Sequence, residues 1–365
     1  MCAQTHEPPG GRLDGLAEAP IRLAANQPPR PYRGGAGIAR LRGGVPIDDF
    51  RPEDFIASMT EVYGGHGVGL SQLDAHTLLR DAIAEDPAGF LGPEHVACWG
   101  ADSSLLVKLL DTGERLFVHY HPTAEFAAEQ LGATRGKNEA WVVIGLDPGT
   151  AEGSGCAYLG FHRQVTDDEL TDWVARQDSA AMLAAMNRLA LGVGDVLFVP
   201  AGVPHAIGPG VTLIELQEPS DLSILLEYRG FDRVDPATAL LGLDLTTAVS
   251  GVDRRAFGTA ELTGLIRPAA GIAELLGRPL PLLPPAAEAY FRAELLAPSS
   301  SVELDQGMSI LIVLAGTGVL GWHGGELPVT AGDTVLIPYG VGVARLHTDP
   351  DDVLRAIRCR PSAPR

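Results

Sequence analysis

Short apolar runs separated by glycine- and proline-rich turns dominate this chain of 365 residues. Runs of about four to eight apolar residues bounded by turn residues are typical of β-strands. By this pattern we predict strands over residues 21–24, 38–42, 105–110, 117–121, 140–144, 156–162, 196–199, 211–215, 223–228, 289–295, 308–314, 317–322, 334–337 and 353–358. So many short strands with turns between them predict a mainly β protein built from small barrels.

Other stretches place apolar residues three and four positions apart, which is the helical period. Pro52 followed by two acidic residues suits the first turn of a helix, and Asp74 can cap a second helix. Thr166 and Glu169 have the spacing of a capping box ahead of a third helix. We predict further helices in three places: after Pro122 and over residues 179–189 and 259–265.

Four polar side chains suggest a shared site. His119 and His121 lie two residues apart in a predicted strand, so both imidazoles point to the same face. Glu139 stands at the mouth of the strand over residues 140–144, and His205 follows the strand over 196–199 after a Pro/Gly turn. Three imidazoles and one carboxylate form a ligand set for a divalent transition metal.

The spacing of these residues resembles the two halves of the cupin signature. The first half is Gly-x5-His-x-His over residues 113–121, and the second is Gly-x5-Pro-x-Gly-x2-His over 194–205. The second half recurs over residues 332–343, but Val343 stands where His205 stood. Near the other ligand positions of this repeat lie Glu303, Asp305 and Ser309, and none of them is a histidine.

The repeat therefore predicts two cupin (jelly-roll) barrels with helical insertions, of which only the first binds metal, so that each chain holds one ion. We expect this order along the chain: a flexible N-terminus (1–20), a catalytic barrel (21–235) with helical insertions at about 52–91 and 166–190, a connector (236–285) and a second barrel without metal ligands (286–365).

Longer stretches resemble class I mannose-6-phosphate isomerases, especially the shorter bacterial ones. The matching segments are His121-Pro122 followed by a charged helix, and residues 136–141, 199–205 and 215–221. The resemblance runs from about residue 20 to 358. It implies a zinc-dependent aldose–ketose isomerase that interconverts mannose 6-phosphate and fructose 6-phosphate, or acts on a related sugar. It also implies that His121, Glu139 and His205 are metal ligands and that Lys137 is the active-site lysine.

Two positions depart from that family. His119 stands where the family usually has glutamine, and an imidazole should bind a metal more tightly than an amide. The metal could then be Fe²⁺ or Mn²⁺ as well as Zn²⁺. The family's catalytic arginine position, five residues after Ser220, holds Leu225, which cannot stabilise an oxyanion. Arg229, four residues further along the predicted strand, is the candidate catalytic replacement.

Two other functions stay open at this point. A metal-dependent dioxygenase built on a cupin would contain iron and consume oxygen. A non-catalytic sugar-binding cupin would bind a sugar without turning it over. Either would use the same ligands, so the motif alone does not separate them from an isomerase.

Composition narrows the class of partner. The net charge is −19, with a pI of about 4.8, which argues against binding to nucleic acids or to anionic membranes. The expected partner is a small-molecule sugar or sugar phosphate, bound by a monomer or a homodimer. Cys2, Cys98, Cys156 and Cys359 are widely spaced, which is typical of free thiols in a reducing compartment. The sequence has no evident signal peptide and no apolar run of about 18 residues, so we expect a cytoplasmic protein.

Overall fold

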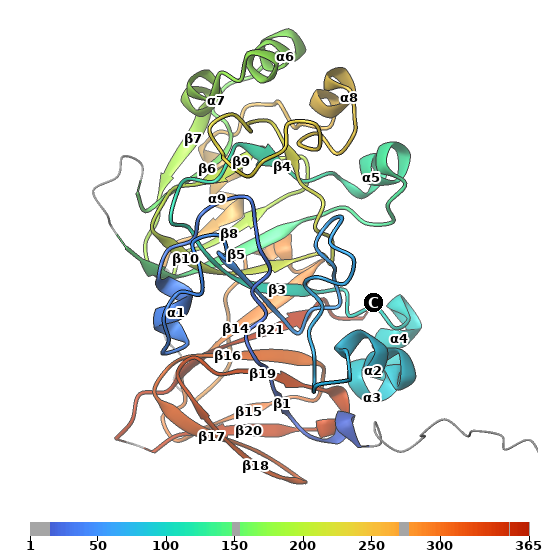
Figure 1. The fold of residues 1–365 in the computed structure, drawn as a ribbon. Helices are drawn as coiled ribbons and strands as arrows, with labels where there is room; N and C mark the ends of the chain where they lie inside the picture. Colours follow the sequence, from blue (N-terminus) through green and yellow to red (C-terminus); the bar gives the residue numbers. More distant parts are fainter. Residues whose placement is uncertain (1–14, 148–153, 270–276, 350, 365) are drawn as a thin grey trace, which may run out of the picture.

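The computed structural model describes residues 15–147, 154–269, 277–349 and 351–364, and most of the predicted flexible N-terminus lies outside these ranges. In this part of the chain the protein is mainly β. Its strands form four antiparallel sheets, none of which closes on itself. Figure 1 shows the sheets as four successive layers, with most of the helices at the end and sides of the stack.

The first two layers come from the N-terminal two thirds of the chain. Sheet I has the order β12-β8-β5-β10-β3-β2, and sheet II has the order β11-β4-β9-β6-β7. The strands of sheet I are β2 (Glu53–Ile56), β3 (Leu106–Asp111), β5 (Glu139–Leu146), β8 (Val196–Val199), β10 (Val211–Gln217) and β12 (Ile266–Arg267). Those of sheet II are β4 (His119–Tyr120), β6 (Cys156–Phe161), β7 (Met186–Ala190), β9 (His205–Ile207) and β11 (Ile224–Leu225).

The other two layers come mainly from the C-terminal part. Sheet III has the order β1-β19-β16-β21-β14-β13, and sheet IV has the order β15-β20-β17-β18. Sheet III contains β1 (Ile21–Arg22), β13 (Leu280–Pro281), β14 (Phe291–Leu296), β16 (Ser309–Ala315), β19 (Thr334–Ile337) and β21 (Arg355–Pro361). Sheet IV contains β15 (Ser301–Leu304), β17 (Thr317–Trp322), β18 (Gly325–Thr330) and β20 (Ala344–His347). The N-terminal strand β1 thus pairs with β19, far along the chain.

Three apolar cores hold the layers together. The largest includes side chains from sheets I and III, where Phe198 stacks on Tyr290 with 5.8 Å between ring centroids. A second lies between sheet II and the helices that cover it, and a third lies between sheets III and IV. Burial of this apolar area is the main stabilising term, at about 25 cal/mol per Å².

The helices lie outside the sheets and vary in length. They are α1 (Gly37–Leu41), α2 (Leu79–Glu85), α3 (Pro87–Leu91), α4 (Pro93–Trp99), α5 (Ala124–Leu131), α6 (Asp167–Arg176), α7 (Ser179–Ala185), α8 (Leu245–Ser250) and α9 (Thr259–Leu265). The capping box of Thr166 and Glu169 is confirmed at the start of α6, and α9 has the predicted bounds. No helix in the described ranges combines the length and the apolar character needed to span a bilayer.

Two predicted elements were wrong. Residues 38–42 form most of helix α1, because Asp111 accepts a hydrogen bond from the backbone of Gly37 and fixes the first turn. The helix predicted from Pro52 is strand β2, because Glu53–Ile56 pair with β3 at the edge of sheet I and all four side chains are buried. Long-range pairing has overridden the local helical signal in the second case.

Three further predictions were partly right. Asp74 accepts hydrogen bonds from the backbone of His76 and Thr77, while the N-cap of α2 is Leu78. The helix predicted over residues 179–189 ends at Ala185 and continues as strand β7. The strand predicted over 223–228 is only Ile224–Leu225.

Candidate metal centre

The three histidines of the cupin-like motif converge between sheets I and II. His119 of β4 pairs with His205 of β9, and His121 follows β4 directly. All three are buried, and one ring nitrogen of each lies within 4.8 Å of the other two. The ring centroids of His119 and His205 are 4.1 Å apart. In the described part of the chain, this is the one group of three or more potential ligands close enough to hold a metal ion.

Backbone carbonyls fix the tautomer of each imidazole. The Nδ1 atoms of His119, His121 and His205 lie 2.9 Å from the carbonyl oxygens of Phe117, Leu222 and Val203, in that order. A carbonyl oxygen only accepts, so each Nδ1 carries the hydrogen, and in a neutral ring Nε2 then offers a lone pair. Burial lowers the pKa of all three rings, that of His205 to about 3, so they are neutral at pH 7.

Glu139 and Lys137 complete this cluster. One Glu139 oxygen lies 2.9 Å from Nε2 of His121 and 2.7 Å from the Lys137 ammonium, and the other accepts from Nε1 of Trp141 at 3.1 Å. Burial alone would raise the pKa of Glu139, but its neighbours, among them the Lys137 ammonium 2.7 Å away, hold this pKa well below its usual value. The carboxylate is therefore ionised and faces the imidazoles.

The backbone before Glu139 positions Lys137. The amide of Lys137 donates to the carbonyl of Pro122 at 3.1 Å, which ties this segment to the start of α5. At Gly136 a Cβ atom would lie 2.6 Å from the amide nitrogen of Ala124, so only glycine permits this close approach. The glycine and the proline of the motif thus place the lysine beside the histidines.

The donor set fits a divalent transition metal. Nε2 of His205 is buried and has no hydrogen-bond partner within the described part of the chain, and a neighbouring Nε2 cannot donate to it. One metal ion bound by the Nε2 atoms of His119, His121 and His205 would satisfy all three lone pairs. Three imidazoles and a carboxylate are ligands that zinc and related ions accept.

The corresponding place in the second half of the molecule has different chemistry. Glu139 pairs with Val199, the residue before Pro200, and Ser309 pairs with Ile337, the residue before Pro338. Ser309 therefore occupies the position of Glu139. Val343 is 53% exposed, and Glu303 forms an exposed ion pair with Arg345. These residues do not assemble a metal site.

A buried charge network continues from the metal centre along sheet I. The Lys108 ammonium lies 3.1 Å from Glu53, 3.5 Å from Asp221 and 3.7 Å from Glu215. Burial opposes the positive charge, but these carboxylates raise the pKa of Lys108 above its usual value. Burial and the charge of Glu139 raise the pKa of Glu215 to about 8, so this acid is mostly protonated at pH 7.

Arg30 joins the same network from the segment that precedes α1. Its two terminal nitrogens donate to the two oxygens of Asp221 at 2.9 and 3.1 Å, and its Nε donates to Glu53 at 3.0 Å. Tyr32 also donates to Glu53. With Glu215 protonated, three cations (Arg30, Lys108 and Lys137) face three carboxylates (Glu53, Glu139 and Asp221).

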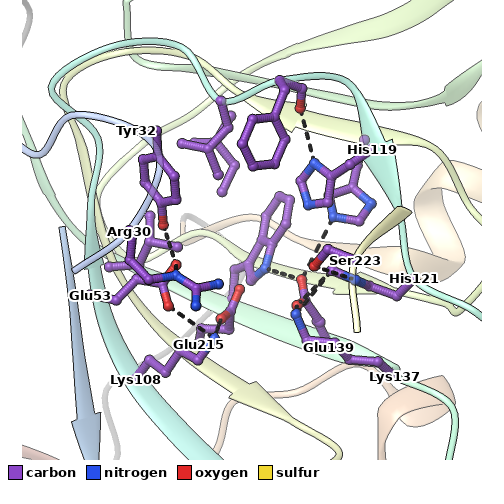
Figure 2. Close-up of a pocket in the computed structure, with 16 residues that line it drawn as sticks. Arg30, Tyr32, Glu53, Lys108, His119, His121, Lys137, Glu139, Glu215 and Ser223 are labelled. Carbon is purple, nitrogen blue, oxygen red and sulfur yellow. Dashed lines mark hydrogen bonds and ion pairs between the residues drawn. The ribbon is translucent and has the colours of Figure 1, made fainter. Parts of the chain in front are cut away.

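The cluster and the network line one small cavity. Figure 2 shows His119, His121, Lys137 and Glu139 on one side, and Arg30, Tyr32, Glu53, Lys108 and Glu215 on the other. The cavity volume is about 30 Å³. This leaves room for about two water molecules, so a sugar does not fit in the cavity as it stands.

Some predicted residues lie elsewhere. Arg229 is exposed, and its guanidinium donates to the backbone carbonyl of Arg176 at 3.1 Å, outside the cavity. The predicted strand ends at Leu225, so the alternation that should have aimed Arg229 inward does not extend to it. Leu225 is buried and pairs with His119.

Sequence reasoning missed the charge network. Lys108 and Glu215 did carry a signal, since each is a charged residue inside an otherwise apolar strand, where burial without a partner is rare. Arg30 carried no such signal, because it lies in a polar, proline-rich segment and meets Asp221 only through the fold.

The relatives found by sequence comparison carry the names of mannose-6-phosphate isomerases, although no family model matches the chain. Mannose-6-phosphate isomerase ManA of Bacillus subtilis (strain 168) is 29% identical over 251 residues, or 67% of this chain and 71% of that protein. Mannose-6-phosphate isomerase of Streptococcus mutans is 34% identical over 155 residues, or 41% of this chain and 45% of that protein.

Solved structures of such enzymes share the fold. A putative mannosephosphate isomerase from Archaeoglobus fulgidus superposes with a TM-score of 0.71 at 19% identity, covering 94% of this chain and 98% of that one. The mannose 6-phosphate isomerase from Bacillus subtilis gives a TM-score of 0.68 at 19% identity, covering 93% of this chain and 99% of that one.

Proposed function

Because this chain belongs with the mannose-6-phosphate isomerases in sequence and fold, we propose that it is a metal-dependent aldose–ketose isomerase that interconverts mannose 6-phosphate and fructose 6-phosphate. The observation that carries this proposal is the convergence of three neutral imidazoles on one point beside Glu139 and Lys137. A related sugar phosphate with the same C1–C2 chemistry is compatible with this site.

We infer that Nε2 of His119, His121 and His205, together with Glu139, holds one divalent transition metal ion. Zinc suits this donor set best, and Fe²⁺ and Mn²⁺ are compatible with it. When bound, such an ion polarises the sugar oxygens and stabilises the negative charge that develops on them. The carbonyls that hold the Nδ1 hydrogens keep the three rings in place for this role.

Isomerisation also moves a proton between neighbouring carbons, which needs groups that hold and return protons. We infer that Lys137, at the edge of the cluster, donates hydrogen bonds to the sugar oxygens. Glu215 lines the same cavity, and its pKa of about 8 lets it exist in both protonation states near neutral pH. Glu215 is therefore our candidate for the proton-transfer group.

The guanidinium in this cavity comes from Arg30 rather than Arg229. Arg30 lies across the cavity from His121 and Lys137, with its ends held by Asp221 and Glu53 (Figure 2). Each terminal nitrogen carries two hydrogens, and only one is used by Asp221. We infer that the remaining N–H groups bind sugar or phosphate oxygens, which is the role that Leu225 cannot take.

Access for a sugar requires the cavity to open. The aromatic side chain of Phe117 lines it and packs edge-on against Tyr32 and Phe231, with ring centroids 5.9 and 5.3 Å away. Phe231 belongs to a stretch whose neighbours are largely exposed. Displacement of these aromatic side chains is the simplest route by which a hexose phosphate could reach the histidines.

We also propose that the four sheets are two cupin domains. Sheets I and II would form the catalytic domain, residues 21–235 with its two insertions, and sheets III and IV the second domain, residues 286–365, after the 236–285 connector. The corresponding registers around Pro200 and Pro338 support this division. Three strands are exceptions: β1 lies in the sheet of the second domain, while β12 of sheet I and β13 of sheet III come from the connector.

The direct test is a coupled assay for fructose 6-phosphate formed from mannose 6-phosphate, with metal content measured on the same sample. We expect one ion per chain and turnover that chelation abolishes. Oxygen uptake by an iron-loaded protein, or sugar binding without turnover by a fully metallated protein, would contradict an isomerase.

A further inference from the structure

The second half of the molecule carries a group of arginines, two of them buried, at the place where the first half carries its candidate metal centre. In sheet I, Glu215 pairs with Lys108 on one side and Trp141 on the other. In sheet III, Arg358 of β21 pairs with Glu294 and Leu311 in the same way. Since Ser309 occupies the position of Glu139, Arg358 occupies the position of Glu215.

The same register exchanges the signs of the charges. Glu294 occupies the position of Lys108, and Arg358 occupies that of Glu215. The acid and the base of this pair are therefore exchanged between sheet I and sheet III. Two residues further along the strands, Arg360 pairs with Arg292, at positions held by Gln217 and Leu106 in sheet I. Three arginines therefore gather at the end of the second pair of sheets.

Arg358 and Arg360 converge on one exposed carboxylate, while Arg292 donates to the carbonyl of Pro361. One Asp305 oxygen accepts from Arg358 at 2.6 Å and from Arg360 at 2.8 Å. Arg358 also donates to the backbone carbonyl of Asp305 at 2.6 Å and to Ser309 at 3.0 Å. The side chain of Asp305 is 65% exposed, while Arg358 and Arg360 are buried. Two guanidinium groups on one oxygen mark a position that favours an anion.

The cationic groups are only partly satisfied. Nε of Arg360 is buried and has no hydrogen-bond partner among the described residues. Burial, and after it the charge of Arg360, lower the pKa of Arg292 and Arg358, while Glu294 and Asp305 act in the opposite direction. Glu294 and Asp305 supply two negative charges against three positive ones. At Gly307 a Cβ atom would lie 2.8 Å from Arg360, so the adjoining loop packs directly on the guanidinium.

We propose that this arginine cluster (Arg292, Arg358 and Arg360) is an anion site that binds a phosphate group, with Asp305 as the internal anion that a phosphate displaces. Guanidinium pairs bind phosphate oxygens through parallel hydrogen bonds, and a dianionic phosphate balances the cluster better than one carboxylate. The proposal does not depend on the isomerase activity, because it uses residues of the second half only.

The test is calorimetric titration of the metal-loaded protein with inorganic phosphate. We expect saturable binding that Asp305→Asn tightens at least about fivefold, because the competing charge is removed, and that Arg360→Met weakens at least about tenfold. Arg345→Met is the matched control, since Arg345 is an exposed arginine of the same half, paired with Glu303. The Arg345→Met protein should bind phosphate with the same affinity as the wild type. Mannose 6-phosphate should compete with inorganic phosphate for the site.

His205→Ala separates this site from the metal centre. Binding that persists in His205→Ala and still responds to Asp305→Asn supports the proposal. Binding that disappears with His205→Ala, or that Asp305→Asn leaves unchanged, overturns it. Asp305→Asn changes an exposed side chain and should not prevent folding, so the decision does not rest on Arg360→Met alone.

Discussion

Replacement of Lys108 by methionine tests whether the buried charge network works as one unit. The ammonium lies within 3.1 to 3.7 Å of three carboxyl groups and is almost fully buried. Methionine has a similar length and no charge, so the substitution removes the central cation while changing the packing little. Glu215 is mostly protonated at pH 7, so the carboxylates left with less compensation are Glu53 and Asp221.

The expected loss of stability is large. Breaking a buried ion pair by removing one partner typically costs about 3–5 kcal/mol, because an uncompensated charge stays buried. Arg30 still contacts both Glu53 and Asp221, which places Lys108→Met toward the lower end, at about 3 kcal/mol. For comparison, the exposed pair of Arg345 and Glu303 should contribute at most about 1 kcal/mol, so Arg345→Met is the matched control.

The loss should depend on pH in a defined direction. In the wild type, neighbouring cations lower the pKa of Glu53 and Asp221 despite burial, so these carboxylates stabilise the fold above their unfolded pKa values, and that stability is lost as pH falls. Without Lys108 these pKa values rise, and protonation relieves the buried charge. The difference between wild type and Lys108→Met should therefore be largest at pH 7 and shrink toward pH 5.

The assay is urea unfolding of both proteins at pH 5, 6 and 7, with metal content held equal. A difference below about 1 kcal/mol at pH 7, or one that does not change with pH, would refute the view that Lys108 compensates buried carboxylates.

Three further predictions follow from the site. His205→Ala should lose most of its metal, measured by elemental analysis. His162→Ala, which removes an exposed ring hydrogen-bonded to the carbonyl of Ala184, should keep it; equal metal content in both would contradict the ligand assignment. Arg30→Lys should lower kcat for mannose 6-phosphate at least about tenfold without loss of metal, because the forked contact to the sugar is lost, and unchanged kcat would remove Arg30 from the site. Glu215→Gln should be more stable relative to the wild type at pH 9 than at pH 6, measured by urea unfolding of the metal-free proteins. The folded pKa of Glu215, about 8, exceeds its unfolded value, so wild-type stability falls as pH rises between these two pKa values, and the variant lacks this loss. The same pH dependence in both proteins would contradict this.

Local spacing was sufficient to predict that the three histidines lie together. His119 and His121 share a face because strand side chains alternate, and a glycine–proline turn places His205 opposite His119. These relations depend on a few neighbouring residues, so the sequence expresses them directly. The tautomers of His119 and His205 also follow from local backbone contacts, since each accepting carbonyl is two residues away from its ring. That of His121 depends on Leu222, 101 positions along the chain.

The charge network depends on distant parts of the chain instead. Arg30 meets Asp221 across 191 positions, and no local pattern reports that contact. The misassigned Pro52 segment had good helical chemistry, yet pairing with β3 determined its conformation. Arg229 failed to reach the cavity because β11 is shorter than its apolar pattern indicated. In each case a tertiary partner decided the outcome.

Strand β1 affects how the molecule can be assembled. Ile21–Arg22 pair with Val335 and Leu336, so a strand that is made early completes a sheet whose other strands come much later in the chain. That edge of sheet III can form only after β19 is synthesised, and closing so long a loop slows folding. Until then β19 presents unpaired backbone groups that could join a neighbouring chain. A fragment that begins in the connector would retain this open edge permanently, so the C-terminal half should be more prone to aggregation alone than within the full-length protein.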